Sequence, residues 1–347
     1  MNTRYRNILI VRTDRIGDVI LTTPAIRALR VMYPASRLTM LVQPATVDLV
    51  KGNPFLDEIL VDDRQETHKG FWGYGRLALT LRQKGFDLAI IFHTKKRTNL
   101  LCFLAGIPER LGYANNKFGF LLTHKVRDDR PCGVKHETGY CLDLLEPLGR
   151  EEIALEAFLP LQKEAEEWAE DLFRKWGNLS ATGVVAVHPG ASCPTKKWPA
   201  ARFGELINIL EERYGCGVIL IGGKDNRETA DQVLSVTRSP VRDMTGQTTV
   251  AQLASLLKRC RLLISNDSGP VHIADALKVP VISIFTRNQP GINPERWGPL
   301  GERSRALSPP LQKGISFAKG EVTDPRYLGY IQTEWVLEAV DSLFKLC

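Results

Sequence analysis

Short apolar segments alternate with longer amphipathic segments along the first 150 residues. Apolar positions recur at helical spacing over residues 19–32 and 71–83, and Pro24 is expected to kink the first of these helices or lie in its first turn. The short apolar runs, which predict buried strands, are residues 7–11, 37–42, 59–61 and 86–92. Such alternation predicts a parallel α/β sheet.

The second half of the chain repeats this pattern. Its predicted strands and helices are residues 183–188, 217–221, 262–265 and 279–285, and residues 201–214, 227–236, 250–259 and 271–277. Residues 151–177 form an acidic helical segment, which we interpret as a connection between the halves. Residues 287–330 are rich in Pro and Gly and predict a long loop, and residues 333–346 predict a closing helix.

Composition narrows the class of protein. The 347 residues are 44% hydrophobic and 24% charged, which is typical of a globular protein. The apolar runs are far shorter than the roughly 20 residues of a membrane span, and no signal-peptide core is visible, so we expect a cytoplasmic protein. The seven cysteines are an odd number without C-x-x-C spacing. They predict inert thiols rather than a disulfide framework or a zinc site.

The net charge of +7 is unevenly distributed. Residues 1–150 carry +8, residues 151–175 carry −5 and residues 176–347 carry +4. A basic surface attracts phosphorylated substrates, anionic membranes or nucleic acid. The basic runs 95–97 and 127–130 lack interleaved aromatic residues, so nucleic acid is the least favoured of the three partners.

Ligands of parallel α/β sheets bind at the carboxyl ends of strands, and the first such end is followed by residues 12–18 (RTDRIGD). Gly17 can adopt an unusual backbone angle in a tight turn. Asp18 is either the N-cap of the next helix or a general base. Arg12 and Arg15 either bind phosphate or are solvated surface charges.

A second candidate segment follows the strand at residues 183–188. Small residues at 189–192 precede Lys196 and Lys197, and such a loop can approach a phosphate that a lysine then neutralises. The spacing is not that of a P-loop. The alternative is that the lysines are ordinary solvated charges.

The third candidate segment is NDSGPVH, residues 266–272. Ser268 and Gly269 are expected at a helix N-terminus, whose free N–H groups and partial positive charge favour an anion such as diphosphate. His272 lies one turn further on, where it is either a ligand contact or a structural side chain.

Several familiar motifs are missing from the sequence. No D-x-D pair is present to hold a metal beside a sugar nucleotide, so we expect lysine and helix dipole to meet the diphosphate charge, without metal or cofactor. No G-x-G-x-x-G follows the first strand, which disfavours a dehydrogenase. No G-x-S-x-G is present, which disfavours a serine hydrolase.

Three motifs in order resemble glycosyltransferase family 9, the ADP-heptose:lipopolysaccharide heptosyltransferases. They are ILIVRTDRIGDVILTTPAIRALR near the start, HPGA…KKWP in the middle and LISNDSGPVHIADAL later, and RWGPLG at residues 296–301 is also similar. The resemblance implies a GT-B architecture, two Rossmann-like domains with parallel sheets that face each other across a cleft. It also implies inverting, metal-independent transfer of heptose from ADP-L-glycero-β-D-manno-heptose to the lipopolysaccharide inner core.

On this resemblance we expect four segments. They are an N-terminal acceptor-binding domain over residues 1–160, a connecting helix over 161–177, a donor domain over 178–330, and a final helix over 331–347 that packs back on the first domain. The basic first domain would dock peripherally on the cytoplasmic face of the inner membrane.

The resemblance also implies roles for individual residues. Asp18 matches the proposed base for the acceptor hydroxyl, with Arg12, Arg15 and Gly17 beside it as acceptor contacts. Lys196 matches a lysine that faces the donor phosphate and is counted with Asp18 as catalytic. The remaining expected donor contacts are Glu228 at the ribose, Thr248 at the adenine, and Asp267, Ser268, Gly269, Pro270 and His272 around the diphosphate.

The sequence departs from the family pattern in two places. Asp14 and Arg15 stand where relatives often carry two small hydroxyl residues, which weakly favours a side-branch heptosyltransferase and a different acceptor. Residues 309–325 lack the cysteine cluster of many relatives. Two alternatives stay open, a GT-B enzyme that uses a UDP- or GDP-sugar and a non-catalytic sugar-nucleotide-binding relative.

Overall fold

The chain divides into two compact units. The computed structural model describes residues 4–149, 153–177, 180, 182–310 and 328–345. The first unit comprises Met1–Arg130 and Glu137–Pro160, and the second comprises Pro131–His136 and Leu161–Cys347. The short segment Pro131–His136 therefore packs with the second unit, although both its neighbours in sequence belong to the first.

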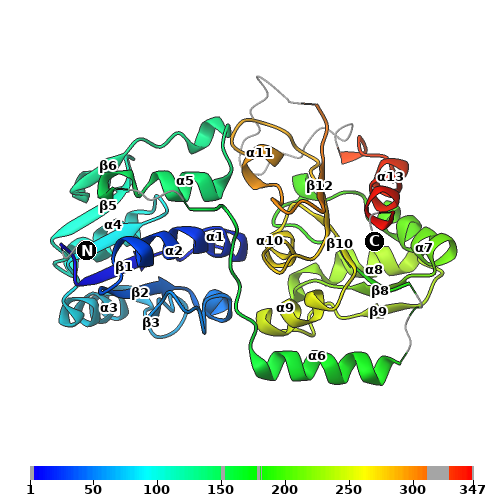
Figure 1. The fold of residues 1–347 in the computed structure, drawn as a ribbon, viewed down its shortest axis with the longest axis horizontal. Helices are drawn as coiled ribbons and strands as arrows, with labels where there is room; N and C mark the ends of the chain where they lie inside the picture. Colours follow the sequence, from blue (N-terminus) through cyan, green and yellow to red (C-terminus); the bar gives the residue numbers. More distant parts are fainter. Residues whose placement is uncertain (1–3, 150–152, 178–179, 181, 311–327, 346–347) are drawn as a thin grey trace. The chain divides into compact units, whose positions relative to one another are not determined.

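The first unit contains a six-stranded parallel sheet in the order β3-β2-β1-β4-β5-β6 (Figure 1). The strands are β1 (Asn7–Val11), β2 (Arg37–Val42), β3 (Glu58–Val61), β4 (Leu88–Ile91), β5 (Glu109–Tyr113) and β6 (His124–Val126). In β1, Ile8 to Val11 are buried, because this central strand is covered on both faces.

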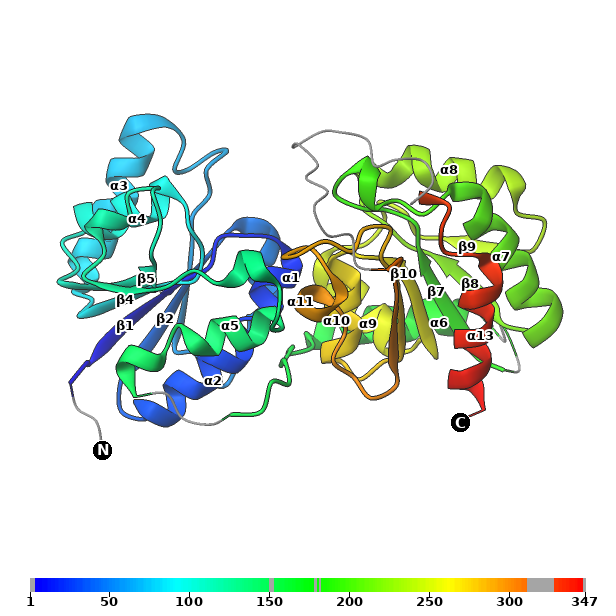
Figure 2. The ribbon, with the colours of Figure 1, turned by 90° about the horizontal axis from the view of Figure 1, so that it is seen from above.

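Helices cover both faces of this sheet. The helices are α1 (Ile16–Ile20), α2 (Thr23–Met32), α3 (Gly70–Lys84), α4 (Lys96–Leu104) and α5 (Glu137–Asp143), with short 3₁₀ helices that include η2 (Gly119–Leu121). Figure 2 shows α3 and α4 on one side of the sheet and α2 and α5 on the other. Leu81 of α3 and Leu101 of α4 pack with Leu9 and Ala89 of the strands in one apolar core.

The second unit contains another six-stranded parallel sheet, in the order β12-β11-β10-β7-β8-β9. Its strands are β7 (Val184–His188), β8 (Gly217–Leu220), β9 (Val241–Asp243), β10 (Leu262–Asn266), β11 (Val281–Ile284) and β12 (Ser304–Leu307). Its helices are α6 (Lys163–Trp176), α7 (Ala200–Tyr214), α8 (Arg227–Val236), α9 (Val250–Lys258), α10 (Gly269–Ala276), α11 (Pro294–Trp297) and α13 (Thr333–Phe344).

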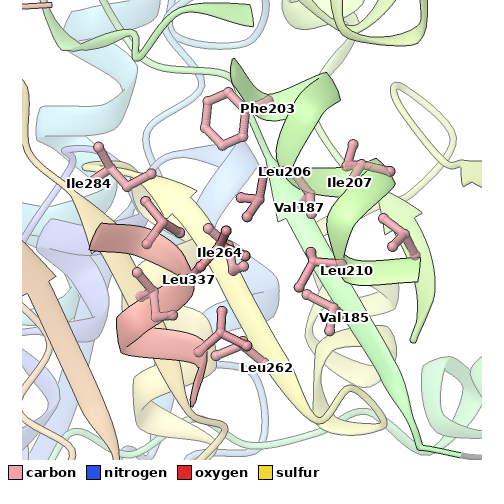
Figure 3. Close-up of a cluster of buried hydrophobic side chains, with 14 of the residues drawn as sticks. Val185, Val187, Phe203, Leu206, Ile207, Leu210, Leu262, Ile264, Ile284 and Leu337 are labelled. Atoms are coloured by element: carbon pink, nitrogen blue, oxygen red, sulfur yellow. The ribbon is translucent and has the colours of Figure 1, made fainter. Parts of the chain in front are cut away.

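The core of the second unit lies between its sheet and helices α7, α8 and α13. Leu206 and Leu210 of α7 share this core with Val187 and Val185 of β7, and Leu337 of α13 lies near Ile264 of β10 (Figure 3). Helix α6 packs against α9, with Ala165 and Ala169 as its buried positions.

Both sheets have the Rossmann strand order. In each sheet the first strand lies at the centre and the chain then builds outward on either side, so the order reverses between β1 and β4 and between β7 and β10. The predicted α/β class, with two parallel sheets, is confirmed. Ligands of such sheets bind beyond the carboxyl ends of the strands at the point of reversal.

The structure corrects three expectations. The helix expected over residues 19–32 is two helices, because Pro24 lies in the first turn of α2 and has no N–H to continue a helix from α1. The expected loop over residues 287–330 contains α11 and the edge strand β12. The closing helix expected over residues 333–346 is shorter, because α13 ends at Phe344 with Lys345 as its C-cap residue, and Leu346 lies outside the described residues.

Helix α13 packs within the second unit. It contacts α7, β11 and β12 of the second unit. Val340 and Leu343 of α13 are fully buried in the second unit's core, which explains this placement.

Candidate functional site

Arg12 follows β1 at the reversal point of the first sheet, and its side chain is buried. Its guanidinium donates hydrogen bonds to the Phe92 carbonyl at 2.7 Å, to Asp18 Oδ1 at 2.5 Å and to Glu137 Oε1 at 3.1 Å. Burial lowers the pKa of Arg12, but the surrounding carboxylates outweigh it and raise the pKa well above its usual value. Arg12 is thus neither a solvated charge nor free to bind a phosphate.

Asp18 lies inside α1 and is not its N-cap. The helix begins at Ile16 with Arg15 as the N-cap residue, and no side chain caps it. The Asp18 carboxylate is instead held by Arg12 and remains partly exposed, with 21% of its side chain accessible. The alternative interpretation of Asp18 as a cap is therefore wrong, and a positioned, partly accessible carboxylate stands at this strand end.

Gly17 and Arg15 flank Asp18 in different environments. Gly17 is buried within α1, and its carbonyl accepts a hydrogen bond from the Leu21 N–H at 2.9 Å. Gly17 does not have a positive φ, so the expected unusual backbone angle is absent. Arg15 is exposed, which leaves its guanidinium accessible to an anionic group near Asp18.

A second carboxylate, Asp14, lies close to Arg12 and is paired with Lys95. Burial raises the pKa of Asp14, but the neighbouring His93 and the cations Arg12 and Lys95 outweigh it and lower the pKa below its usual value. Burial also lowers the pKa of the neighbouring His93 to about 3, so His93 is neutral near pH 7. Asp14 is therefore a fixed negative charge beside the Arg12–Asp18 pair.

In the second unit, Lys196 forms an ion pair with Asp267, 71 residues further along the chain. Lys196 ends the short 3₁₀ helix η5 (Pro194–Lys196). The nearby Trp198 is anchored as well. Its N–H donates to the Asn266 side-chain oxygen at 3.0 Å, and the Asn266 side-chain amide donates to the Pro189 carbonyl at 2.7 Å. The middle and late motifs thus meet at the reversal point of the second sheet.

His188 and Ser268 connect the same two strand ends. His188, the last residue of β7, pairs in register with Ser265 of β10. Its Nδ1 lies 3.2 Å from the Ser265 hydroxyl and 3.0 Å from the Ser268 hydroxyl. Burial lowers the pKa of His188 to about 4, so the ring is neutral near pH 7 and orients the Ser268 side chain.

Helix α10 begins directly after Ser268. Gly269 is its first residue, and Pro270 occupies its first turn, where a missing N–H costs no helical hydrogen bond. His272 is buried within the helix. The first turn of α10 and the ammonium of Lys196 place two sources of positive potential beside Asp267.

The other two expected donor contacts lie at the starts of α8 and α9. Glu228 is exposed in the first turn of α8. Thr248 is half-buried and precedes Thr249, which caps α9 by accepting a hydrogen bond from the Gln252 N–H.

The loops after β8 and β9 are joined to each other and to the loop after β7. The Gly246 N–H donates to the Gly222 carbonyl at 2.8 Å. A Cβ added at Gly190 would meet the Asn226 side chain at 2.3 Å, so a larger residue there would displace Asn226. The loops after β7, β8 and β9 are therefore connected to one another at this edge of the sheet.

Sequence reasoning missed three residues that hold these sites together: Glu137, Asn226 and Asn266. Glu137 reaches Arg12 from 125 positions away, and no local pattern marks such a contact. Asn266 lies within the recognised NDSGPVH segment, so its place in the motif was the one available signal.

The described ranges contain neither a metal-binding cluster nor a membrane-spanning helix. No group of three or more His, Cys, Asp or Glu side chains is arranged to hold a metal ion. No helix among those residues is long and apolar enough to cross a membrane.

Comparisons with known proteins agree on one family. Residues 74–326 match the model of glycosyltransferase family 9 (heptosyltransferase). The chain is 29% identical over 284 residues to lipopolysaccharide heptosyltransferase 3 of Escherichia coli K12. The aligned residues make up 78% of this chain and 79% of that protein.

Solved structures show the same architecture. A family 9 glycosyl transferase from Veillonella parvula has a TM-score of 0.86 at 26% identity, over 100% of this chain and 99% of that chain. The E. coli heptosyltransferase WaaC with ADP has a TM-score of 0.70 at 16% identity, over 97% and 99%. The fold is GT-B, and the protein is a glycosyltransferase. Because the family model spans well over half of the sequence, the chain belongs to glycosyltransferase family 9, the heptosyltransferase family.

Proposed function

We propose that this enzyme transfers heptose from ADP-L-glycero-β-D-manno-heptose to the inner core of lipopolysaccharide. Family membership and the heptosyltransferase relatives support the transferred sugar. The observation that carries the proposal is the ion pair of Lys196 with Asp267 at the start of α10. It brings a lysine and a helix N-terminus together where a Rossmann-ordered sheet binds its ligand.

The donor diphosphate binds between Lys196 and the first turn of α10 in this proposal. Lys196 exchanges its contact with Asp267 for the phosphate oxygens, and the Ser268 hydroxyl, oriented by His188, donates to them. Gly269 and Pro270 leave room for close approach, and His272 supports the helix from within. Charge that develops on the departing ADP is stabilised by groups already in place.

In this proposal the adenosine part of the donor lies over the loops that lead into α8 and α9. Glu228 is exposed at the start of α8 and accepts hydrogen bonds from the ribose hydroxyls. Thr248 lies at the start of α9 and contacts the adenine. The hydrogen bond of Gly246 with Gly222 keeps these two loops side by side.

Asp18 acts as the general base of a single inverting displacement. It removes the proton from the acceptor hydroxyl as that oxygen attacks the anomeric carbon, and the bond to ADP breaks on the opposite face. One carboxylate suffices for this step, whereas retaining glycosidases use two close carboxylates. Arg12 orients the Asp18 carboxylate, and exposed Arg15 and buried Gly17 shape the acceptor side.

We propose that transfer needs no metal ion and no cofactor. Lys196 and the N-terminus of α10 supply the positive charge that a divalent cation supplies in other sugar-nucleotide enzymes. We also propose that the enzyme acts in the cytoplasm, at the surface of the inner membrane, where the basic first unit meets an acidic, lipid-anchored acceptor.

The test is a transfer assay with ADP-heptose and a truncated inner-core acceptor in the presence of EDTA. Transfer is expected in EDTA, and Asp18→Asn is expected to lower kcat by about 100- to 10,000-fold, the usual contribution of a general base. Asp18→Asn is expected to remain folded, with a modestly lower melting temperature, because its amide oxygen can still accept from Arg12 and Glu137 still neutralises the buried guanidinium. Undiminished transfer by Asp18→Asn would exclude Asp18 as the base, and transfer that EDTA abolishes would exclude metal independence.

A further inference from the structure

We propose that one outer face of the first unit docks on an anionic lipid bilayer. This proposal rests on the peripheral membrane placement proposed above and assigns it to specific residues. The docking face is formed by the starts of α3 and α4 together with η2. Its defining residues are Phe71, Trp72, Phe120, Lys69, Lys96 and Lys117.

Large aromatic side chains on this face are unusually exposed. Phe71 and Trp72 in the first turn of α3 are 80% and 86% exposed, and Phe120 in η2 is 73% exposed. The Phe71 and Trp72 rings contact each other edge to face, with centroids 5.5 Å apart. Single exposed apolar residues are ordinary, but a group of aromatic rings on one layer marks an interaction surface.

These side chains come from segments that pack together. Helices α3 and α4 lie on the same side of the first sheet (Figure 2). The Tyr74 hydroxyl of α3 donates to the Arg97 carbonyl of α4 at 2.6 Å. Lys96 of α4 lies 5.7 Å from the centroid of the Phe118 ring, which in turn contacts Phe120. The aromatic rings of α3 and η2 therefore flank the start of α4.

The charge of the same region is strongly one-sided. Residues 67–127 contain eleven Lys and Arg but only two acidic residues, Asp87 and Glu109. Both acidic residues are engaged by the N-terminal segment. Asp87 accepts from the backbone N–H groups of Arg6 and Asn7, and Glu109 pairs with Arg4.

The lysines of the docking face are available to a ligand. Lys69, Lys96 and Lys117 form no ion pair with any residue that the structure describes, in contrast to Lys84 and Lys95, which pair with Glu58 and Asp14. Unpaired cations among exposed aromatic rings match a membrane–water interface, where rings lie at the level of the headgroups and lysines contact anionic lipids.

The placement of this face agrees with the proposed chemistry. Helices α3 and α4 follow β3 and β4, so their first turns lie at the carboxyl edge of the sheet. Asp18 follows β1 at that same edge. An acceptor anchored in the bilayer would therefore present its sugars on the side of the unit that carries the base.

Vesicle flotation with the full-length protein tests the proposal. The probes are vesicles of phosphatidylcholine alone and of phosphatidylcholine with a third phosphatidylglycerol. Wild type is expected to bind the anionic vesicles and to lose binding as salt rises. Phe71→Ser/Trp72→Ser and Lys96→Gln/Lys117→Gln are each expected to lower the partition coefficient by about tenfold or more, because rings and cations both contribute.

Matched control variants lie elsewhere on the chain. Val31→Ser removes a 55% exposed apolar side chain from α2, and Lys175→Gln/Lys345→Gln removes two exposed lysines from the second unit. Both controls are expected to bind vesicles like the wild type. Equal loss in the controls, or full binding by the docking-face variants, would overturn the assignment.

A second readout compares the wild type with one conservative substitution at an exposed side chain, Trp72→Phe. Brominated lipids quench tryptophan fluorescence at short range, and Trp72 is expected to supply the quenched component, which Trp72→Phe removes. Unchanged quenching in Trp72→Phe would contradict the proposal. So would displacement of the protein from vesicles by single-stranded RNA, or a dimer that the Phe71→Ser/Trp72→Ser substitutions dissociate.

Failure of this proposal can be told from failure of the proposed function. Transfer to a water-soluble acceptor fragment does not require a bilayer, so the docking-face variants are expected to keep wild-type kcat in that assay. Loss of vesicle binding with retained transfer supports both proposals, and retained vesicle binding with retained transfer overturns only the docking face.

Discussion

The buried side chain of Arg12 donates a hydrogen bond to the partly exposed carboxylate of Asp18 at 2.5 Å. The same guanidinium binds Glu137 and the Phe92 carbonyl, so its orientation is fixed by three partners on different segments. A carboxylate held in this way stays in one orientation without closing off its exposed side. This pair is the structural basis for assigning Asp18 as the base.

Arg12→Lys is expected to destabilise the protein. An ammonium cannot reproduce the planar fork that reaches Phe92, Asp18 and Glu137 together, and a buried charge without its partner typically costs about 3–5 kcal/mol of unfolding free energy. Urea unfolding measures this loss. The matched control is Arg37→Lys, at an ion pair with Glu58 whose arginine is 58% exposed, where a change below about 1 kcal/mol is expected. Equal effects at both positions would contradict the structural role of Arg12.

Lys196→Gln is expected to lower kcat by about 100- to 1,000-fold, because one lost contact to a developing negative charge commonly costs about 2.7–4 kcal/mol of barrier. Steady-state transfer kinetics provide the measurement. The neighbouring Lys197 is the control, since its ammonium binds the Thr229 hydroxyl at 2.8 Å rather than Asp267. Similar losses in Lys197→Gln would show that general basicity, and not the position of Lys196, supports transfer.

Acid is expected to destabilise the protein partly through His188. Burial lowers the pKa of His188 to about 4 in the folded state, against about 6.5 in an unfolded chain. Between these values the unfolded state binds more protons, so the unfolding free energy falls as the pH drops from about 6.5 to about 4.

Urea unfolding of His188→Gln at several pH values checks this expectation. The variant should show a shallower decline than the wild type across that window, and His124→Gln, at a partly exposed pair with Glu109, should decline like the wild type. A decline that His188→Gln leaves unchanged would contradict the role of the buried ring.

Strands with apolar runs could be predicted from sequence, including the edge strand β3 (EILV), whereas the interior strand β5 (ERLGY) and the polar edge strands could not. Strands such as β1 and β10 are continuous apolar runs, because helices cover both of their faces. Strands β9 (VRD) and β12 (SRAL) are short and polar. Each lies at an edge of the second sheet, where it has one neighbouring strand. Strand β6 (HKV) is another edge strand of this kind. Local patterns do not separate such segments from loops.

The candidate site was predictable to a similar degree. Motif position indicated Asp18, Lys196 and Ser268 as strand-end residues, and all three lie at such ends. The partners that fix them are distant in sequence, as Glu137 is from Arg12. Helix α13 likewise buries Val340 and Leu343 in the core of the second unit, a contact that no local pattern marks.

The most direct test of the central claim compares ADP, UDP and GDP in a thermal-shift assay of the purified enzyme in EDTA. A ligand at 100 times its Kd adds about 2.7 kcal/mol of stability, which shifts the melting temperature measurably. We expect ADP alone to stabilise the protein and Lys196→Gln to reduce the shift. Stabilisation by UDP or GDP instead of ADP, or by none of the three, would contradict an ADP-heptose donor site on the second unit.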